Sequence, residues 1–284
     1  MKIGVSGASG HLGAATVAEL CARGAAHQTI AISRTPAVVG AQVEVRLGDY
    51  DHPETLSAAY AGIDRLMLIP SADVRPGFRE RHFVTAIDAA VKAGVGHILL
   101  ISSAATREVG SASMYAPYFV GEQHLMQQAS SWTILRMNYY AESFAQLLPF
   151  SLPNGVITGL GENRVAFVSR DDVAAAAAGI LTTDGHRGAI YNATGPAAIS
   201  GAERAALVAD ISGQPMSFMV LEEAVLRSGM QQSGIDQHYI NALVDIEKSF
   251  VQGCFDIVTG DVEYLAGRLA TPLDHILAAN LARA

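Results

Sequence analysis

Short apolar runs alternate with segments of helical periodicity through the first half of the chain. The runs are rich in residues that favour strands and cover residues 2–6, 29–33, 43–47, 65–69, 97–101 and 133–136. Residues 97–101 are almost wholly apolar, as in a parallel strand covered on both faces. Between them, residues 14–22, 53–60 and 79–93 have the pattern of helices. This alternation predicts an α/β fold with a doubly wound parallel sheet over residues 1–150.

The pattern changes from about residue 148, where prolines and glycines interrupt it. We expect extended pieces at 164–169 and 191–194, helices at 171–181, 201–212, 221–228 and 237–252, and a further segment at 261–279. Residues 151–284 are therefore predicted to form a smaller, mostly helical substrate-binding region, from which about 164–195 returns to the first domain. Asp171 and Asp172 precede an alanine-rich run and are interpreted as a helix cap.

Large side chains of the second half can be interpreted in two ways. They could line a substrate pocket or be ordinary core, and they are Met216, Phe218, Met219, Met230, Tyr239 and Phe250.

Composition narrows the possible partners. Half of the 284 residues are hydrophobic, 16% are charged and the net charge is −8, which favours a packed globular protein without a dedicated nucleic-acid surface. The apolar runs are too short to span a bilayer, and the N-terminus begins with a strand rather than a basic leader, so we expect a cytoplasmic protein without a membrane segment. Cys21 and Cys254 predict no disulfide framework, and the scattered histidines predict no metal site.

A glycine-rich turn follows the first predicted strand. Gly7, Gly10 and Gly13 have the spacing GxxGxxG between that strand and the first helix, with Ser9, His11 and Leu12 among them. In this context such glycines bind a dinucleotide: they permit a tight turn, let backbone amides approach the pyrophosphate and let the helix lie close to the strand. The alternative is a tight turn without a ligand, in which His11 is merely exposed.

Three further positions lie where strands end. Arg34 follows the second strand, where an acidic residue would favour NAD and an arginine accommodates a 2′-phosphate, so we predict NADP(H); an ordinary exposed arginine is the alternative. Asp49 follows the third strand and could bind the adenine amino group or cap the helix that begins at Pro53. Pro70 and Ser71 follow the fourth strand at the ligand-binding edge and are predicted cofactor contacts.

Several longer segments resemble one family across nearly the whole chain. They are VSGASGHLG, AISR, LGDYDHPETLSAAYAGID, AVKAGVGHILLISS, WTILRMNYYAESF, FVSRDDVAAAAAGIL and IYNATGP. The chain resembles the NmrA-like, atypical short-chain dehydrogenase/reductases, most of all type-2 NAD(P)H:quinone oxidoreductases and triphenylmethane reductases. The resemblance implies a Rossmann fold, NADP(H), two lobes and a small-molecule acceptor, with a homodimer as a possibility.

The expected catalytic pair of the wider superfamily, Tyr-x-x-x-Lys, is missing. Aligning Glu122 with the family's glutamate places Tyr118 at the usual lysine position and Met114 at the usual tyrosine position. We therefore predict Tyr118 and Ser102 as hydrogen-bonding catalytic groups, with Ser102 also near the cofactor. Asn138 could orient the nicotinamide or the acceptor, or be a turn residue.

A site without a strong acid favours acceptors whose reduced form needs little help from a proton donor. The leading hypothesis is an NADPH-dependent oxidoreductase that passes hydride to a quinone or similar conjugated aromatic acceptor. A non-catalytic NADP-binding redox sensor is the alternative. Reduction of an activated C=C or imine bond also stays open.

Overall fold

The computed structural model describes residues 1–38, 42–110 and 113–282, and it divides the chain into two compact units. Unit 1 contains residues 1–137, 170–193 and 261–268, and unit 2 contains residues 138–169, 194–260 and 269–284. The chain thus leaves the first unit at Asn138, twelve residues before the predicted boundary at 150, because the turns after the sixth strand pack in unit 2. The return of residues 261–268 to unit 1 was not predicted.

Unit 1 is built on a seven-stranded sheet with the order β3-β2-β1-β4-β5-β6-β8. All its neighbouring strands pair in parallel. The strands are β1 (Ile3–Ser6), β2 (Thr29–Ser33), β3 (Glu44–Leu47), β4 (Arg65–Leu68), β5 (His97–Ser103), β6 (Trp132–Met137) and β8 (Ala189–Ala193). The chain crosses from one side of β1 to the other between β3 and β4, and this order confirms the predicted doubly wound sheet of the Rossmann type.

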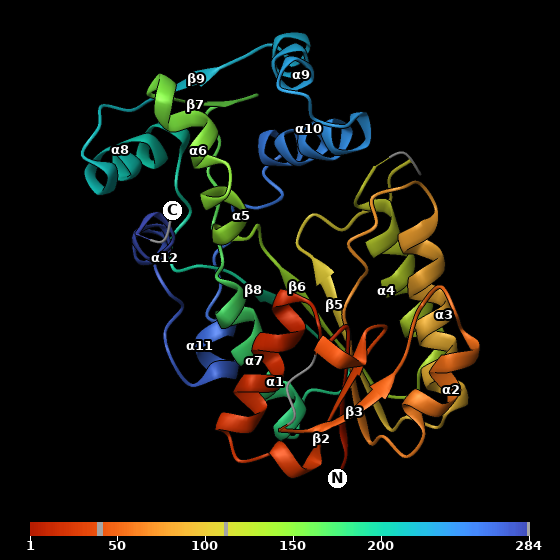
Figure 1. The fold of residues 1–284 in the computed structure, drawn as a ribbon. Helices are drawn as coiled ribbons and strands as arrows, with labels where there is room; N and C mark the ends of the chain where they lie inside the picture. The colour runs from red at the N-terminus through yellow and green to blue at the C-terminus, as the bar shows by residue number, and fades with distance from the viewer. Residues whose placement is uncertain (39–41, 111–112, 283–284) are drawn as a thin grey trace. The chain divides into compact units, whose positions relative to one another are not determined.

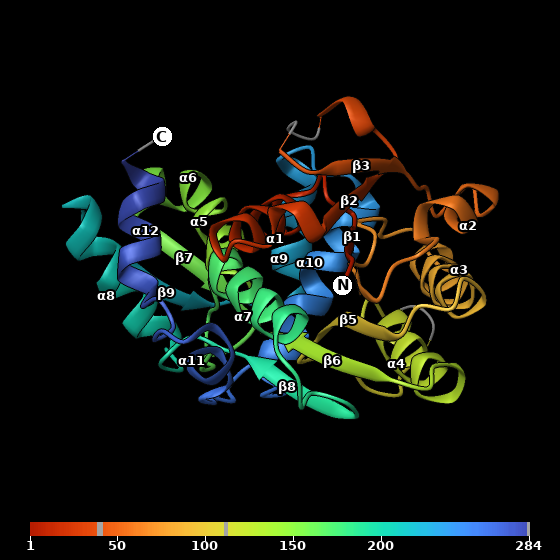
Figure 2. The ribbon, with the colours of Figure 1, turned by 90° about the horizontal axis from the view of Figure 1, so that it is seen from below.

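Helices cover both faces of this sheet, as Figures 1 and 2 show. On one face lie α1 (His11–Ala22), α7 (Arg170–Thr182) and α11 (Asp261–Ala266), and on the other lie α2 (Glu54–Tyr60), α3 (Phe78–Lys92) and α4 (Ala116–Gln128). Short 3-10 turns occur at Ala26–Gln28 and Pro36–Val38. Helix α4 was not predicted.

The alanine-rich helix α7 is buried because α1 and α11 both pack against it. A Cβ on Gly179 would lie 2.0 Å from the carbonyl oxygen of Leu265, so only glycine allows this approach of α11. Asp171 and Asp172 lie inside the first turn of α7 rather than before it. The Asp172 side chain is buried and forms an ion pair with Arg268, which follows α11.

Unit 2 is mostly helical and carries a small parallel sheet of two strands, β7 and β9, that the sequence did not predict. Its elements are α5 (Ala141–Ala145), α6 (Leu148–Ser151), the 3-10 turn Leu152–Asn154, β7 (Val156–Gly159), α8 (Gly201–Ser212), β9 (Ser217–Val220), α9 (Glu223–Gln232), α10 (Gln237–Val251) and α12 (Leu273–Leu281). Leu226, Ile240 and Val244 form a buried cluster between α9 and α10. In the described ranges no helix is long and apolar enough to cross a bilayer.

Candidate cofactor and active site

The glycine turn after β1 has the close packing that a dinucleotide cradle needs. Gly7 adopts φ +92°, a conformation that side chains disfavour, and its N–H donates to the Ile32 carbonyl at 2.9 Å. A Cβ on Gly13 would lie 2.2 Å from the carbonyl oxygen of Gly7. Helix α1 therefore lies directly on the turn, as predicted from the glycine spacing.

The first turn of α1 points uncapped backbone amides toward the carboxyl edge of the sheet. Gly10 is the N-cap residue, and no side chain caps the amides that follow it. His11 and Gly10 are exposed, whereas the Leu12 side chain is buried and anchors the helix. Unpaired amides at the positive end of a helix dipole attract a phosphate, so these residues fit the pyrophosphate of a dinucleotide.

Hydroxyl groups connect the glycine turn to the end of β2. Ser33 Oγ donates to Ser9 Oγ at 2.9 Å and accepts the Thr35 N–H at 2.9 Å. Arg34 lies between Ser33 and Thr35 in the sequence. Its exposed side chain forms no ion pair or hydrogen bond with any described residue. A cation beside two hydroxyl-bearing residues at this edge suits a 2′-phosphate.

Asp49 closes the loop after β3. Its carboxylate accepts the Asp51 N–H at 3.0 Å and lies 3.1 Å from His52 Nδ1. The interpretation of Asp49 as the cap of α2 is wrong, because the N-cap residue is Pro53 and no side chain caps this helix. A contact with adenine stays a prediction.

The loop after β4 is tied to the end of β1. The Ile69 N–H donates to the Ser6 carbonyl at 3.3 Å. The Tyr50 hydroxyl can donate to Ser6 Oγ at 3.0 Å or to the Ile69 carbonyl at 3.1 Å. Burial raises the pKa of Tyr50 to about 12, so the phenol keeps its proton. Pro70 and Ser71 consequently lie at the switch point between β1 and β4, where open α/β sheets bind ligands.

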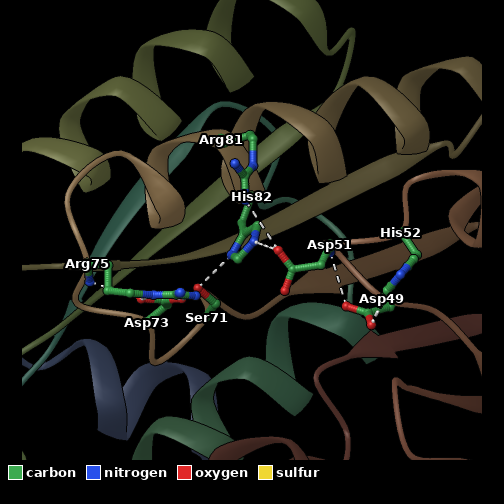
Figure 3. Close-up of polar contacts among 8 residues, drawn as sticks. All are labelled: Asp49, Asp51, His52, Ser71, Asp73, Arg75, Arg81 and His82. Carbon is green, nitrogen blue, oxygen red and sulfur yellow. Dashed lines mark hydrogen bonds and ion pairs between the residues drawn. The ribbon is translucent and has the colours of Figure 1, made fainter.

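Ser71 belongs to a polar network that the sequence did not predict (Figure 3). His82, on the first turns of α3, places Nδ1 2.8 Å from Ser71 Oγ and Nε2 2.9 Å from Asp51 Oδ1. Arg79 Nε donates to the Ser71 carbonyl at 2.9 Å. Nearby, the Asp73 carboxylate pairs with Arg75, whose hydrogen bonds lower the Asp73 pKa to about 2. The two contacts of His82 join residues 11 and 31 positions apart, which no local spacing reveals.

Ser102 lies at the end of β5, as predicted, but its hydroxyl forms a hydrogen bond with a neighbouring side chain. Ser102 Oγ donates to Glu122 Oε1 at 2.6 Å, and both side chains are buried. Arg136 holds the same carboxylate with two hydrogen bonds, Nε to Oε1 at 2.9 Å and Nη2 to Oε2 at 2.6 Å. Glu122 therefore links β5 to β6 through α4, and the predicted contacts of Ser102 with the cofactor and the acceptor stay predictions.

Tyr118 lies on α4 with a buried ring and a hydroxyl that forms no hydrogen bond with the described residues. The ring packs edge-on against Phe83 at 5.7 Å between centroids, and the Arg79 guanidinium carbon lies 5.3 Å from the ring centroid. Since Arg79 also holds the Ser71 carbonyl, Tyr118 and Ser71 share a neighbour. A hydrogen bond between the Tyr118 phenol and an acceptor stays a prediction.

Asn138 is the first residue of unit 2, and its side chain forms hydrogen bonds within that unit. Its Nδ2 donates to the Ala166 carbonyl at 2.8 Å and to the Phe255 carbonyl at 3.2 Å. The side-chain oxygen is buried and has no hydrogen-bond partner among the described residues. The amide nitrogen thus joins separate segments of unit 2, and the predicted contact of Asn138 with nicotinamide or acceptor stays a prediction.

Unit 2 contains an apolar cavity of about 410 Å³. Tyr139, Phe144, Leu226 and Met230 are among the side chains that line it, together with Phe250. Of the six large residues singled out in the sequence, Met230 and Phe250 line this cavity, while Met219 and Tyr239 are exposed.

Two ionisable groups interrupt the apolar lining of the cavity, namely Arg204 and Glu247. Burial lowers the pKa of Arg204 and raises the pKa of Glu247. The Glu247 carboxyl accepts the Leu160 N–H at 3.2 Å. The cavity therefore combines aromatic and aliphatic walls with a few polar atoms, as sites for small aromatic ligands do.

A family model described as NAD(P)H-binding matches residues 7–184. The chain belongs to the NAD(P)H-binding family. The matched segment contains the glycine turn, Arg34, the Ser71 network and Tyr118, which are the features of unit 1 described above.

Individual relatives agree with this family. Quinone oxidoreductase 2 of Escherichia coli K12 is 31% identical over 88% of both chains. NAD(P)H azoreductase of Xenophilus azovorans is 26% identical, covering 81% of this chain and 76% of its own. The crystal structure of the Citrobacter sp. triphenylmethane reductase complexed with NADP(H) superposes with a TM-score of 0.90 at 27% identity, covering 99% of this chain and all of that one. The predicted class of NAD(P)H-dependent oxidoreductase, of the quinone and dye reductase type, is confirmed.

Proposed function

We propose that the protein is an NADPH-dependent reductase that delivers hydride to a quinone or a similarly conjugated aromatic acceptor. One observation carries the choice of acceptor: the buried Ser102 hydroxyl donates to Glu122 at 2.6 Å and is not free to protonate a substrate oxygen. The relatives named as quinone oxidoreductase, azoreductase and triphenylmethane reductase support the same class of acceptor.

On the cofactor side, the residues of unit 1 fit NADP(H). The bound dinucleotide would supply the hydride. The uncapped amides of α1 would hold its pyrophosphate, and the unpaired Arg34 guanidinium would hold the 2′-phosphate. The neighbour in which NADP(H) is bound supports the choice of NADP(H) over NAD(H).

On the acceptor side, the chain offers hydrogen bonds rather than strong acids. Tyr118 carries a hydroxyl without a hydrogen-bond partner in the described part of unit 1, and Glu122 rather than a lysine stands four residues after it. A simple ketone needs a proton at its developing alkoxide, whereas a reduced quinone spreads its negative charge over the ring and oxygens. The reduced quinone therefore forms with less help from a proton donor, and orientation of the acceptor supplies most of the catalysis.

Taken by itself, the cavity in unit 2 suits a small aromatic molecule. Its volume of about 410 Å³ and its Phe, Tyr and Leu walls match a substituted aromatic ring, and Arg204 or Glu247 could hydrogen-bond a carbonyl group.

The function is tested by following NADPH oxidation with a panel of benzoquinones, naphthoquinones, a triphenylmethane dye and simple ketones. We expect turnover on the conjugated acceptors and a kcat/KM for simple ketones at least about 100-fold lower, because about 3 kcal/mol of proton-donor assistance is missing. Faster reduction of ketones would contradict the choice of acceptor. Tight binding of NADPH without turnover on any acceptor would contradict the proposed activity.

A further inference from the structure

A continuous chain of hydrogen bonds runs from solvent to the ligand edge of unit 1 through His82 (Figure 3). The Asp51 side chain is 40% exposed and lies 2.9 Å from His82 Nε2, while the His82 side chain is only 5% exposed. On its other side His82 Nδ1 lies 2.8 Å from Ser71 Oγ. The order carboxylate, imidazole, hydroxyl determines where the protons can be.

The charge of Asp51 settles the tautomer of His82. The hydrogen bond from His82 and the positive charge of Arg81 lower the Asp51 pKa, so Asp51 is a carboxylate and can only accept. The proton of neutral His82 must then lie on Nε2, which leaves a lone pair on Nδ1. Ser71 consequently donates its O–H to Nδ1, and its remaining lone pairs are free to accept a hydrogen bond.

We propose that Asp51 and His82 are positioning residues that hold the Ser71 hydroxyl as a hydrogen-bond acceptor for a ribose hydroxyl of the bound dinucleotide. The identity of this ligand rests on the proposed function. Ser71 is only partly buried and follows β4 next to the glycine turn, where the Ile69 side chain lies against Gly7. Ribose hydroxyls are the dinucleotide's donors next to its pyrophosphate, so they match an acceptor at this position.

Other charged groups near His82 come from every element that packs around α3. Asp51 and Asp73 lie in the loops after β3 and β4, and Arg79 and Arg81 lie on α3 itself. The acidic and imidazole groups of α4 and α2 interact with other residues than His82. Glu122 pairs with Arg136, His124 pairs with Asp88, and the charge of Glu54 acts on His52. Asp51 is thus the charged side chain in direct contact with the imidazole of His82.

The test is to measure dissociation constants for NADP⁺ by calorimetry between pH 5.5 and 8, without an acceptor. Ser71→Ala should raise Kd at pH 7.5 about three- to tenfold, the loss expected for one hydrogen bond. His82→Gln keeps an amide within reach of Asp51 but not of Ser71 and should weaken binding similarly. His82→Asn keeps an amide beside Ser71 and should recover part of the affinity.

A double-mutant cycle distinguishes positioning from a merely structural role. Ser71→Ala combined with His82→Gln should weaken binding no more than either change alone, because both remove the same contact. His124→Asn is the matched control, since His124 also pairs with a carboxylate, Asp88, and should leave Kd unchanged.

Additive losses in the cycle, or an affinity of His82→Asn no better than that of His82→Gln, would overturn this positioning role. Both outcomes leave the proposed reductase intact, because the unaltered protein would still bind NADP⁺. Failure of the unaltered protein to bind NADP⁺ at any pH would instead overturn the proposed function together with the ligand assigned to Ser71. Thermal unfolding of each variant confirms that affinity is measured on folded protein.

Discussion

Replacing Arg34 with alanine should convert a preference for NADPH into near-indifference between NADPH and NADH. The guanidinium is exposed and has no partner in the described ranges, so its removal breaks no contact and should change the free energy of unfolding by less than about 0.5 kcal/mol. A charge-assisted hydrogen bond to phosphate contributes about 1.5–3 kcal/mol, and exposure to solvent reduces this to about 1–2 kcal/mol.

This range corresponds to a loss of NADPH affinity of about 5- to 30-fold with little change for NADH. The assay is fluorescence titration of both reduced cofactors at 50 and 300 mM salt. The loss should shrink at high salt, because salt screens exposed charges. Lys92→Ala is the control: it removes an exposed cation at the far end of α3 and should leave both affinities unchanged.

Equal weakening of NADPH and NADH by Arg34→Ala would refute the assignment of Arg34 to the 2′-phosphate. It would mean that Arg34 acts on a part that the two cofactors share, such as the pyrophosphate. If Arg34→Ala weakened the binding of neither NADPH nor NADH, Arg34 would be an ordinary exposed arginine without a role in cofactor binding. In both cases the preference for NADP(H) would need another source than the end of β2.

Three further changes test the packing and electrostatics of unit 1. Gly13→Ala should abolish measurable NADPH binding and lower the melting temperature, because its Cβ would fall 2.2 Å from a backbone oxygen; Gly229→Ala, where a Cβ meets open space, is the control. Glu122→Gln should lower the free energy of unfolding in urea by about 2 kcal/mol, since it removes the charge that pairs with Arg136 and accepts from Ser102; an unchanged midpoint would contradict this. Desolvation, aided by the charge of Arg65, lowers the pKa of His97 from 6.5 to about 4, so the unfolded chain binds the proton first and stability should fall as pH drops from 6.5 to 4. His97→Gln should flatten the melting temperature over that range, and an unaltered slope would count against it.

The elements that the sequence predicted best are those whose signal is local. Buried parallel strands appear as apolar runs, and the glycine spacing of the turn is a property of seven consecutive residues. Helix α4 was not predicted, because Pro117 and Gly121 interrupt its helical pattern of apolar residues. In the structure Pro117 lies in its first turn, and Gly121 faces the Phe83 ring, where a Cβ would lie 2.8 Å from Cγ. Strands β7 and β9 were not predicted, because β7 lies in a stretch punctuated by Gly155, Gly159 and Gly161 and the two strands pair across about sixty positions of sequence.

Some features of the candidate site depend on neighbouring residues in the sequence, and others depend on residues that are far apart in it. The dinucleotide cradle is local, so a sequence pattern was sufficient to predict it. Ser71 was also predicted, from its place after a strand, but what orients its hydroxyl comes from a different helix and a different loop. His82 looks like one of several polar residues on an amphipathic helix, and only the fold brings Asp51 to one of its ring nitrogens and Ser71 to the other. Since a neutral imidazole between a carboxylate and a hydroxyl has a single consistent set of protons, the fold specifies the hydrogen-bonding character of Ser71 as well as its position.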